Sequence, residues 1–146
     1  MRISQLAGSA RVLLALGLCI VVATACGDDG ESGGPQIEFF DGVVPSTVPD
    51  DFPLPDAAIP GAALVNSGVD PVFTEVTMRI PAPRESVFAY FQANLPLREY
   101  SLGSVNDHLG RLTIEFTKGD LSGTLDLQEE ISIQVTTVVL KLNPPG

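Results

Sequence analysis

Residues 111–127 read RLTIEFTKGDLSGTLDL and predict a β-hairpin, the element around which the fold is built. Apolar residues hold even positions before the turn and odd positions after it. Paired residues must share a face of the sheet, so the loop must contain an even number of residues. Gly119-Asp120, with glycine first, suits a two-residue type II′ turn. In this register an aromatic ring fills the space over a glycine. The predicted pairs are Phe116 with Gly123, Ile114 with Leu125 and Leu112 with Leu127.

Two strands and one helix are expected upstream of the hairpin. Residues 62–67 and 72–80 alternate as strands do, and a turn at residues 68–71 joins them. A helix is predicted over residues 84–95, because Pro83 suits its first position and Pro96 is expected to stop it. The residues on the predicted buried stripe of the helix are Val87, Phe88, Phe91 and Leu95. Those on the predicted core face of the second strand are Val72, Val76, Met78 and Ile80.

The chain after the helix is expected to be strand. One strand begins at Tyr100 and Leu102, and residues 104–110, SVNDHLG, are expected to turn the chain. In the last strand, residues 131–142, the apolar residues change parity, so we expect a β-bulge near Thr136-Thr137. The residues expected to face the core on either side of it are Ile131, Ile133, Val135, Val138, Leu140 and Leu142. The predicted fold class is α+β, a mostly antiparallel sheet of about six strands in the order ββαββββ with one helix on one face.

A proline-rich arm, VPSTVPDDFPLPDAAIPGA at residues 44–62, precedes these elements. Its prolines are Pro45, Pro49, Pro53, Pro55 and Pro60. Each proline fixes its own φ and favours extended geometry in the residue before it, so no helix is expected here. Asp50, Asp51 and Asp56 could offer oxygen ligands to calcium, but their spacing does not match a calcium loop. We interpret them as turn residues.

The N-terminal residues have the layout of a secretory signal. Arg2 and Arg11 precede an uncharged apolar run at residues 12–23, which is shorter than the roughly 20 residues of a spanning helix. Residues 23–26, ATAC, resemble the lipobox of bacterial lipoproteins, in which the cysteine thiol receives a diacylglyceryl group and becomes the mature N-terminus. The resemblance implies that Cys26 is lipidated. The alternatives are a plain cleaved secretory signal and an uncleaved anchor.

Three segments follow: a lipoprotein signal peptide at residues 1–25, a flexible acidic Gly-rich tether at residues 26–44, and a small α+β domain with its proline-rich arm at residues 45–146. The acyl chains on one cysteine are expected to hold the protein on the membrane without a polybasic patch. Ile37, Phe39 and Phe40 interrupt the polarity of the tether. We expect them to dock on the domain, since exposed apolar clusters are costly, with a partner contact as the alternative.

Charge and cysteine content exclude several functions. The 146 residues contain 8 Lys and Arg against 18 Asp and Glu, and removal of residues 1–25 would leave 6 basic and 18 acidic side chains, a net charge of −12. Such a chain repels phosphate backbones, so no nucleic-acid partner is expected. Cys19 lies in the signal and Cys26 is the predicted lipidation site. The folded part is therefore expected to contain no disulfide, thiolate nucleophile or zinc–sulfur site.

The folded part resembles the small C-terminal domains of bacterial lipoproteins whose function is not established. The resemblance spans roughly residues 50–142 and is carried by DDFPLPDAAIPGAALV, FAYFQANLPLREY and IEFTKGDLSGTLDL. Those domains have a proline-rich segment, a helix rich in Phe and Tyr, and a Gly-Trp pair that starts the next strand. Glu99-Tyr100 stands where Gly-Trp would be expected. The resemblance implies the fold and no activity.

No catalytic motif is present, and no catalytic residue, cofactor or metal site is predicted. His108 is the one histidine and is expected to be solvated in a turn. Glu129 and Glu130 are adjacent acids expected in the turn before the last strand, where we interpret them as solubilising. Paired glycosidase carboxylates are the alternative.

The outward face of the C-terminal hairpins is predicted to be a polar platform without basic residues. Its predicted members are Thr113, Glu115, Thr117, Ser122, Thr124, Asp126, Ser132 and Gln134. A solvated sheet face is the simplest interpretation. The alternative is a binding surface for sugars or a protein partner, both of which accept contacts rich in hydroxyl groups.

These features predict a lipid-anchored extracytoplasmic protein without enzymatic activity, a binding or accessory module of the bacterial cell envelope. Its expected partners are the membrane, through acylated Cys26, and an envelope protein or polysaccharide. One alternative is a hydrolase of envelope polymers, which would need a polar cleft with a perturbed carboxylate. Another is a structural role in envelope assembly, which would predict an exposed apolar patch that includes Phe39 and Phe40.

Overall fold

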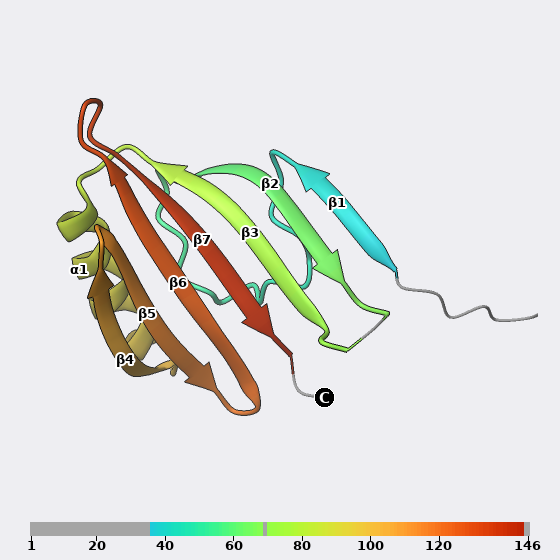
Figure 1. The fold of residues 1–146 in the computed structure, drawn as a ribbon. Helices are drawn as coiled ribbons and strands as arrows, with labels where there is room; N and C mark the ends of the chain where they lie inside the picture. The colour runs from blue at the N-terminus through green and yellow to red at the C-terminus, as the bar shows by residue number, and fades with distance from the viewer. Residues whose placement is uncertain (1–35, 69, 145–146) are drawn as a thin grey trace, which may run out of the picture. The chain divides into compact units, whose positions relative to one another are not determined.

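The computed structural model describes residues 36–68 and 70–144, so the predictions made for residues 1–35, including the signal peptide and Cys26, lie outside it. The described residues form one seven-stranded antiparallel sheet in the order β1-β2-β3-β7-β6-β5-β4, with a single helix (Figure 1). The elements are β1 Ile37–Asp41, β2 Ile59–Asn66, β3 Phe73–Ile80, α1 Arg84–Leu97, β4 Ser101–His108, β5 Arg111–Lys118, β6 Leu121–Glu130 and β7 Val135–Asn143. The predicted α+β class with a mostly antiparallel sheet is confirmed.

The element order differs from the prediction by one strand. Residues Ile37–Asp41, which fall inside the predicted tether, pair with β2 as an edge strand. The order is therefore βββαββββ, and the boundary expected at residue 45 lies after the first strand. Ile37, Phe39 and Phe40 do dock on the sheet, as expected, but by backbone pairing. Only Phe40 packs against the core, while Phe39 remains 77% exposed.

The central hairpin has the predicted register. Phe116 faces Gly123, Ile114 faces Leu125, and Lys118 and Leu121 close a two-residue turn. Gly119 has a φ of +58° and Asp120 has no positive φ, which is the φ pattern of a type II′ turn. The aromatic ring and the glycine fit closely, because a Cβ added at Gly123 would lie 2.5 Å from Phe116 Cζ.

Two other turns differ from the prediction, the first in length and the second in position. β4 continues through His108, so the chain turns at Leu109-Gly110 alone, where both residues have positive φ as in a type I′ turn. β6 continues through Glu130, and the chain turns over residues 131–134. β6 and β7 pair without a register shift, so the predicted bulge is wrong. Ile131 and Ile133 lie in the turn, 81% and 51% exposed, and the half-buried Val135 begins β7 on the face opposite the buried Thr136 and Val138, contrary to the prediction.

The helix starts at the predicted residue and ends two residues later than predicted. Pro83 is the extended residue before α1, and Pro96 lies inside its last turn. The helix ends in a Schellman motif, in which Tyr100 N–H donates to Leu95 O at 3.1 Å and Glu99 N–H donates to Pro96 O at 3.1 Å. Glu99 occupies the left-handed position of this motif with a φ of +65°. Glycine is the usual residue there.

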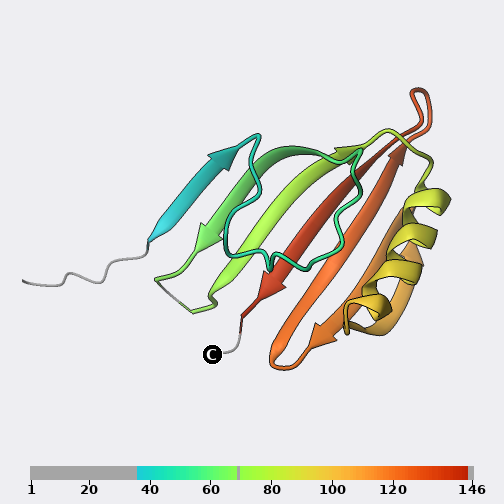
Figure 2. The same cartoon turned by 180° about the vertical axis from the view of Figure 1, so that it is seen from behind.

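One face of the sheet is covered, by α1 and by the residues 42–58 that connect β1 to β2 (Figure 2). Val87, Phe91 and Leu95 of α1 are buried against the sheet, as predicted for the helix stripe, and Phe88 is partly buried. The proline-rich segment is not helical, as predicted, and it contributes the buried Phe52. The Phe52 ring lies 5.4 Å from the ring centroids of both Tyr100 and Phe116.

Strand β3 shows the same division of faces. Val76, Met78 and Ile80 point into the core as predicted. Val72 precedes the strand and is 40% exposed, and the buried residue at that end of the face is Thr74, whose hydroxyl donates to Thr47 Oγ1 at 2.8 Å. The core therefore lies on one side of the sheet, and the opposite side carries no helix in the described part of the chain.

Candidate functional site

The face of the sheet opposite α1 is uncovered over the described residues, and we call it the open face (Figure 1). Strand residues alternate between the two faces, so each strand contributes every second side chain to it. On β5 and β6 the cross-strand pairs on this face are Thr113 with Asp126, Glu115 with Thr124 and Thr117 with Ser122. These six predicted platform residues lie together. Ser132 and Gln134 do not join them, because they belong to the turn between β6 and β7.

Basic residues also lie on the open face, contrary to the prediction. Arg111 pairs with Gln128 across β5 and β6, and Lys141 of β7 pairs with both Thr124 and Glu75. The alternation of residues along these strands already indicated that both basic side chains lie on the open face. Arg111 has the parity of the outward Thr113, and Lys141 falls between two buried leucines.

Three hollows follow one another across the open face, with volumes of about 440, 220 and 360 Å³. Arg111 and Gln128 line both the first and the second hollow. Glu75 and Lys141 line both the second and the third. The three hollows therefore adjoin one another in a row, a shallow depression that runs from β4 across β5, β6 and β7 to β3. Such a shape fits an extended ligand better than a compact one.

The polar groups along the depression are partly held in place. Thr113 Oγ1 donates to Asp126 Oδ1 at 2.6 Å, and Lys141 Nζ lies 3.3 Å from Glu75 Oε2. Arg111 is exposed and has no ion-pair partner among the described residues. His108 ends β4 opposite Arg111 and lines the first hollow, so its predicted place in a turn is wrong. These side chains offer a ligand hydrogen bonds, the positive charge of Arg111 and the negative charge of Asp126.

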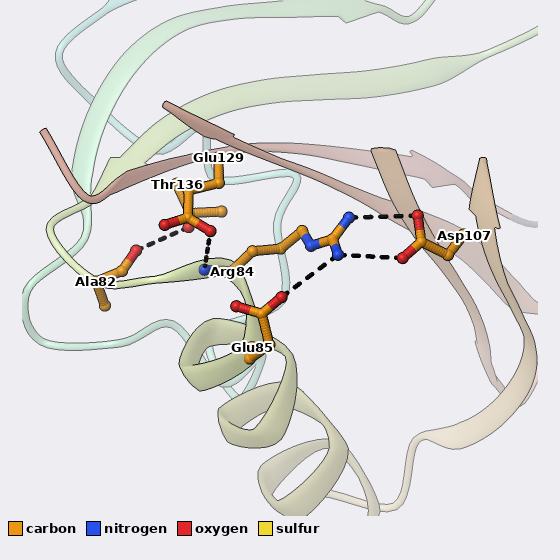
Figure 3. A network of polar contacts seen from close by, with 6 residues as sticks. All are labelled: Ala82, Arg84, Glu85, Asp107, Glu129 and Thr136. Carbon is orange, nitrogen blue, oxygen red and sulfur yellow. Dashed lines mark hydrogen bonds and ion pairs between the residues drawn. The ribbon is translucent and has the colours of Figure 1, made fainter. Parts of the chain in front are cut away.

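Glu129 has a structural role that was not predicted from the sequence. It lies in β6, not in a turn, and its Oε2 accepts a hydrogen bond of 3.2 Å from the backbone N–H of Arg84 at the start of α1 (Figure 3). The guanidinium of Arg84 lies between Glu85 and Asp107, 3.3 Å and 3.1 Å from their oxygens. These contacts join the start of α1 to β4 and β6. They occupy Glu129 in holding the helix, which argues against a glycosidase role for it.

Asp51 belongs to a second polar cluster, on the covered side. Its carboxylate accepts a hydrogen bond from the Tyr100 hydroxyl at 3.2 Å and forms an ion pair with Lys118, whose Nζ lies 4.7 Å from the Tyr100 ring centroid. The hydrogen bond from Lys118 lowers the pKa of Asp51. Burial, with the charge of Asp51, raises the pKa of Tyr100 to about 12. Asp51 therefore stays ionised at neutral pH and is unsuited to donate a proton, as the acid of a hydrolase must.

Residues 36–68 and 70–144 contain no group of three or more His, Cys, Asp or Glu side chains placed to hold a metal ion. Asp50, Asp51 and Asp56 accordingly form no such group. Within the same part of the chain, no helix has both the length and the apolar character needed to cross a membrane.

Comparison with known proteins found no matching family model, no matching curated protein and no matching solved structure.

Proposed function

We propose that this protein is a lipid-anchored extracytoplasmic module of the bacterial cell envelope that binds its ligand on the open face and catalyses no reaction. The observation that supports the proposal is that only one face of the sheet is covered in the described part of the chain. The helix and residues 42–58 both lie on one face, and the other face presents a row of adjoining hollows lined by polar and charged residues. An antiparallel sheet with one covered face is stable in water, so the open face is available for binding without further protein layers.

The anchor in this proposal rests on the sequence. The positive N-terminus, the short apolar run and the lipobox-like residues 23–26 support lipidation of Cys26. Two or three acyl chains on one cysteine hold a protein on a membrane essentially permanently. The domain is then presented at the membrane surface, where envelope polymers and envelope proteins are concentrated.

The ligand best suited to the depression is an extended molecule rich in hydroxyl groups, a polysaccharide or a polar protein segment. Thr113, Thr124 and Gln128 supply hydrogen-bonding groups along the path, and Arg111 supplies a positive charge. The hydrolase alternative gains no support from the acids described above, since Glu129 holds the helix and Asp51 stays ionised. The envelope-assembly alternative predicts an exposed patch of Phe39 and Phe40. Phe39 fits it with 77% exposure, but Phe40 packs against the core.

Site-specific photo-crosslinking in intact cells tests the open face. A photoreactive amino acid replaces Gln128, which is exposed and lines two of the hollows, in the full chain. The matched control places the same amino acid at Gln92, an exposed glutamine on α1. We expect a crosslinked envelope protein or glycan at position 128 and none at position 92. Equal crosslinking at the two positions, or none at either, would contradict a binding role for this face.

A further inference from the structure

The described sheet has two edge strands, β1 and β4, and they differ in how they are protected. An open edge presents unpaired N–H and C=O groups that another strand can join. β4 has a register shift between Leu102 and Val105, which interrupts its edge. β1 pairs with β2 in unbroken register and contains no proline and no lysine. Of the usual protections of an edge strand, β1 has a short length and two acidic residues.

Two hydrogen bonds show which backbone groups of β1 face the open edge. Ser67 N–H donates to Gln36 O at 3.1 Å, and Gly42 N–H donates to Gly61 O at 2.9 Å. In an antiparallel ladder the residues that bond to the neighbouring strand alternate, so the even-numbered residues of β1 bond to β2. The N–H and C=O groups of Ile37, Phe39 and Asp41 therefore point away from the sheet.

The side chains of the same three residues lie on the open face, beside this edge. Phe39 is 77% exposed and pairs with Leu64, and Ile37 is 49% exposed. Large apolar side chains at an open edge are costly to leave in water, and they are the usual anchors where an added strand docks. The backbone and the side chains thus offer one site for an extended segment.

The charge of β1 indicates which kind of segment can dock on its edge. Glu38 and Asp41 are the charged residues of β1, and β1 and β2 contain no basic residue. Across residues 36–68 and 70–144 there are 6 basic and 15 acidic side chains, a net charge of −9. A second copy of this chain would bring the same acidic edge into contact with itself. A segment with basic residues complements Glu38 and Asp41.

We propose that β1 is a docking edge for an extended, basic segment of a partner protein, which adds as an eighth strand. In an antiparallel alignment the partner places a basic residue opposite Asp41, apolar residues opposite Phe39 and Ile37, and a second basic residue opposite Glu38. The Phe39 ring packs against the apolar side chains of the added strand. The outward-facing backbone N–H and C=O groups of Ile37, Phe39 and Asp41 form the new hydrogen-bond ladder. This site is separate from the polar depression and does not depend on lipidation of Cys26.

Photo-crosslinking in cells also tests this site, with a photoreactive phenylalanine analogue at Phe39 in the full chain. Leu97, the last residue of α1, is the matched control because it is also 77% exposed. We expect crosslinking to another protein at position 39 and not at position 97. Mass spectrometry should map the crosslink to a segment with alternating apolar and basic residues. A crosslink to a second copy of this chain, to a segment without basic residues, or to nothing would overturn the proposal.

A blocking variant separates strand addition from nonspecific hydrophobic contact. With the photoreactive residue at Ile37, Phe39→Pro removes an amide that faces the open edge and leaves the bonds between β1 and β2 intact. Phe39→Ala, which loses the same ring and keeps the amide, is the matched control, and loss of the edge hydrogen bond should make crosslinking of Phe39→Pro about fivefold weaker than that of Phe39→Ala. Equal crosslinking of the two variants, with Phe39→Pro still melting near the temperature of the parent, would show that no strand is added there.

Discussion

Replacement of Gly123 by alanine should destabilise the protein more than any other single methyl group added to β6. A Cβ at this position would lie 2.5 Å from Phe116 Cζ and 2.6 Å from the backbone oxygen of Lys141. The ring can tilt, but the Lys141 oxygen is held by the pairing of β7 with its neighbours. Overpacking of a core costs about 1–3 kcal/mol, and we expect the upper end here because one obstacle is backbone.

The assay is thermal unfolding followed by circular dichroism. A loss of about 2–3 kcal/mol in the free energy of unfolding should lower the melting temperature of a domain of this size by about 10–15 °C. Thr124→Ala, one residue further along β6 on the open face, is the matched control and should change the free energy by less than about 0.5 kcal/mol. Phe116→Leu should recover part of the loss in a double variant. A Gly123→Ala variant as stable as the parent would refute the predicted packing of this hairpin.

Three further predictions concern the covered side. Glu99→Gly should raise the free energy of unfolding in urea by about 1 kcal/mol, because the left-handed φ of +65° suits glycine; an unchanged or lower value would contradict the helix end described above. The pKa of Tyr100 is raised to about 12, so its contribution to stability should be complete below pH 10 and be lost as the pH rises toward 12. Tyr100→Phe, which also loses the bond to Asp51, should lack this alkaline decline, and equal declines in both proteins would refute the assignment. Thr136→Val should cost about 1–2 kcal/mol in thermal unfolding, since the buried hydroxyl donates to Ala82 O at 2.8 Å, and a neutral effect would show that water replaces that bond.

The strongest local patterns predicted their elements well. The parity argument at residues 111–127 led to the correct pairs and the correct two-residue turn, because side-chain alternation and turn length constrain each other. The helix stripe of Val87, Phe91 and Leu95 was also correct, since apolar residues that recur every three or four positions are typical of a helix with one buried side.

The errors fall where the chain breaks a local preference. Leu109 adopts a left-handed φ of +51° in a two-residue turn, a position where Asn or Gly is usual, so the turn was predicted too long. Ile131 and Ile133 are of a residue type typical of strands, but they lie exposed in a turn. Because they were assigned to the last strand, a bulge was predicted there. Pro96 lies in the last turn of α1, where the Schellman bonds beyond it end the helix.

The candidate site was predicted only in part. The open face and six of its polar residues followed from strand alternation. The depression itself depends on how five strands lie side by side, and no pattern within one strand contains that information. The edge position of β1 was missed for the same reason, because three apolar residues in a five-residue segment of a polar stretch do not show which strand the segment joins.

Anchoring through Cys26 is the central claim, and mass spectrometry of the intact protein isolated from the membrane fraction of its host tests it most directly. The predicted result is a chain that begins at Cys26 and carries the mass of a diacylglyceryl group, with or without a further acyl chain. A chain that still includes residues 1–25, or one with an unmodified thiol at Cys26, would contradict it.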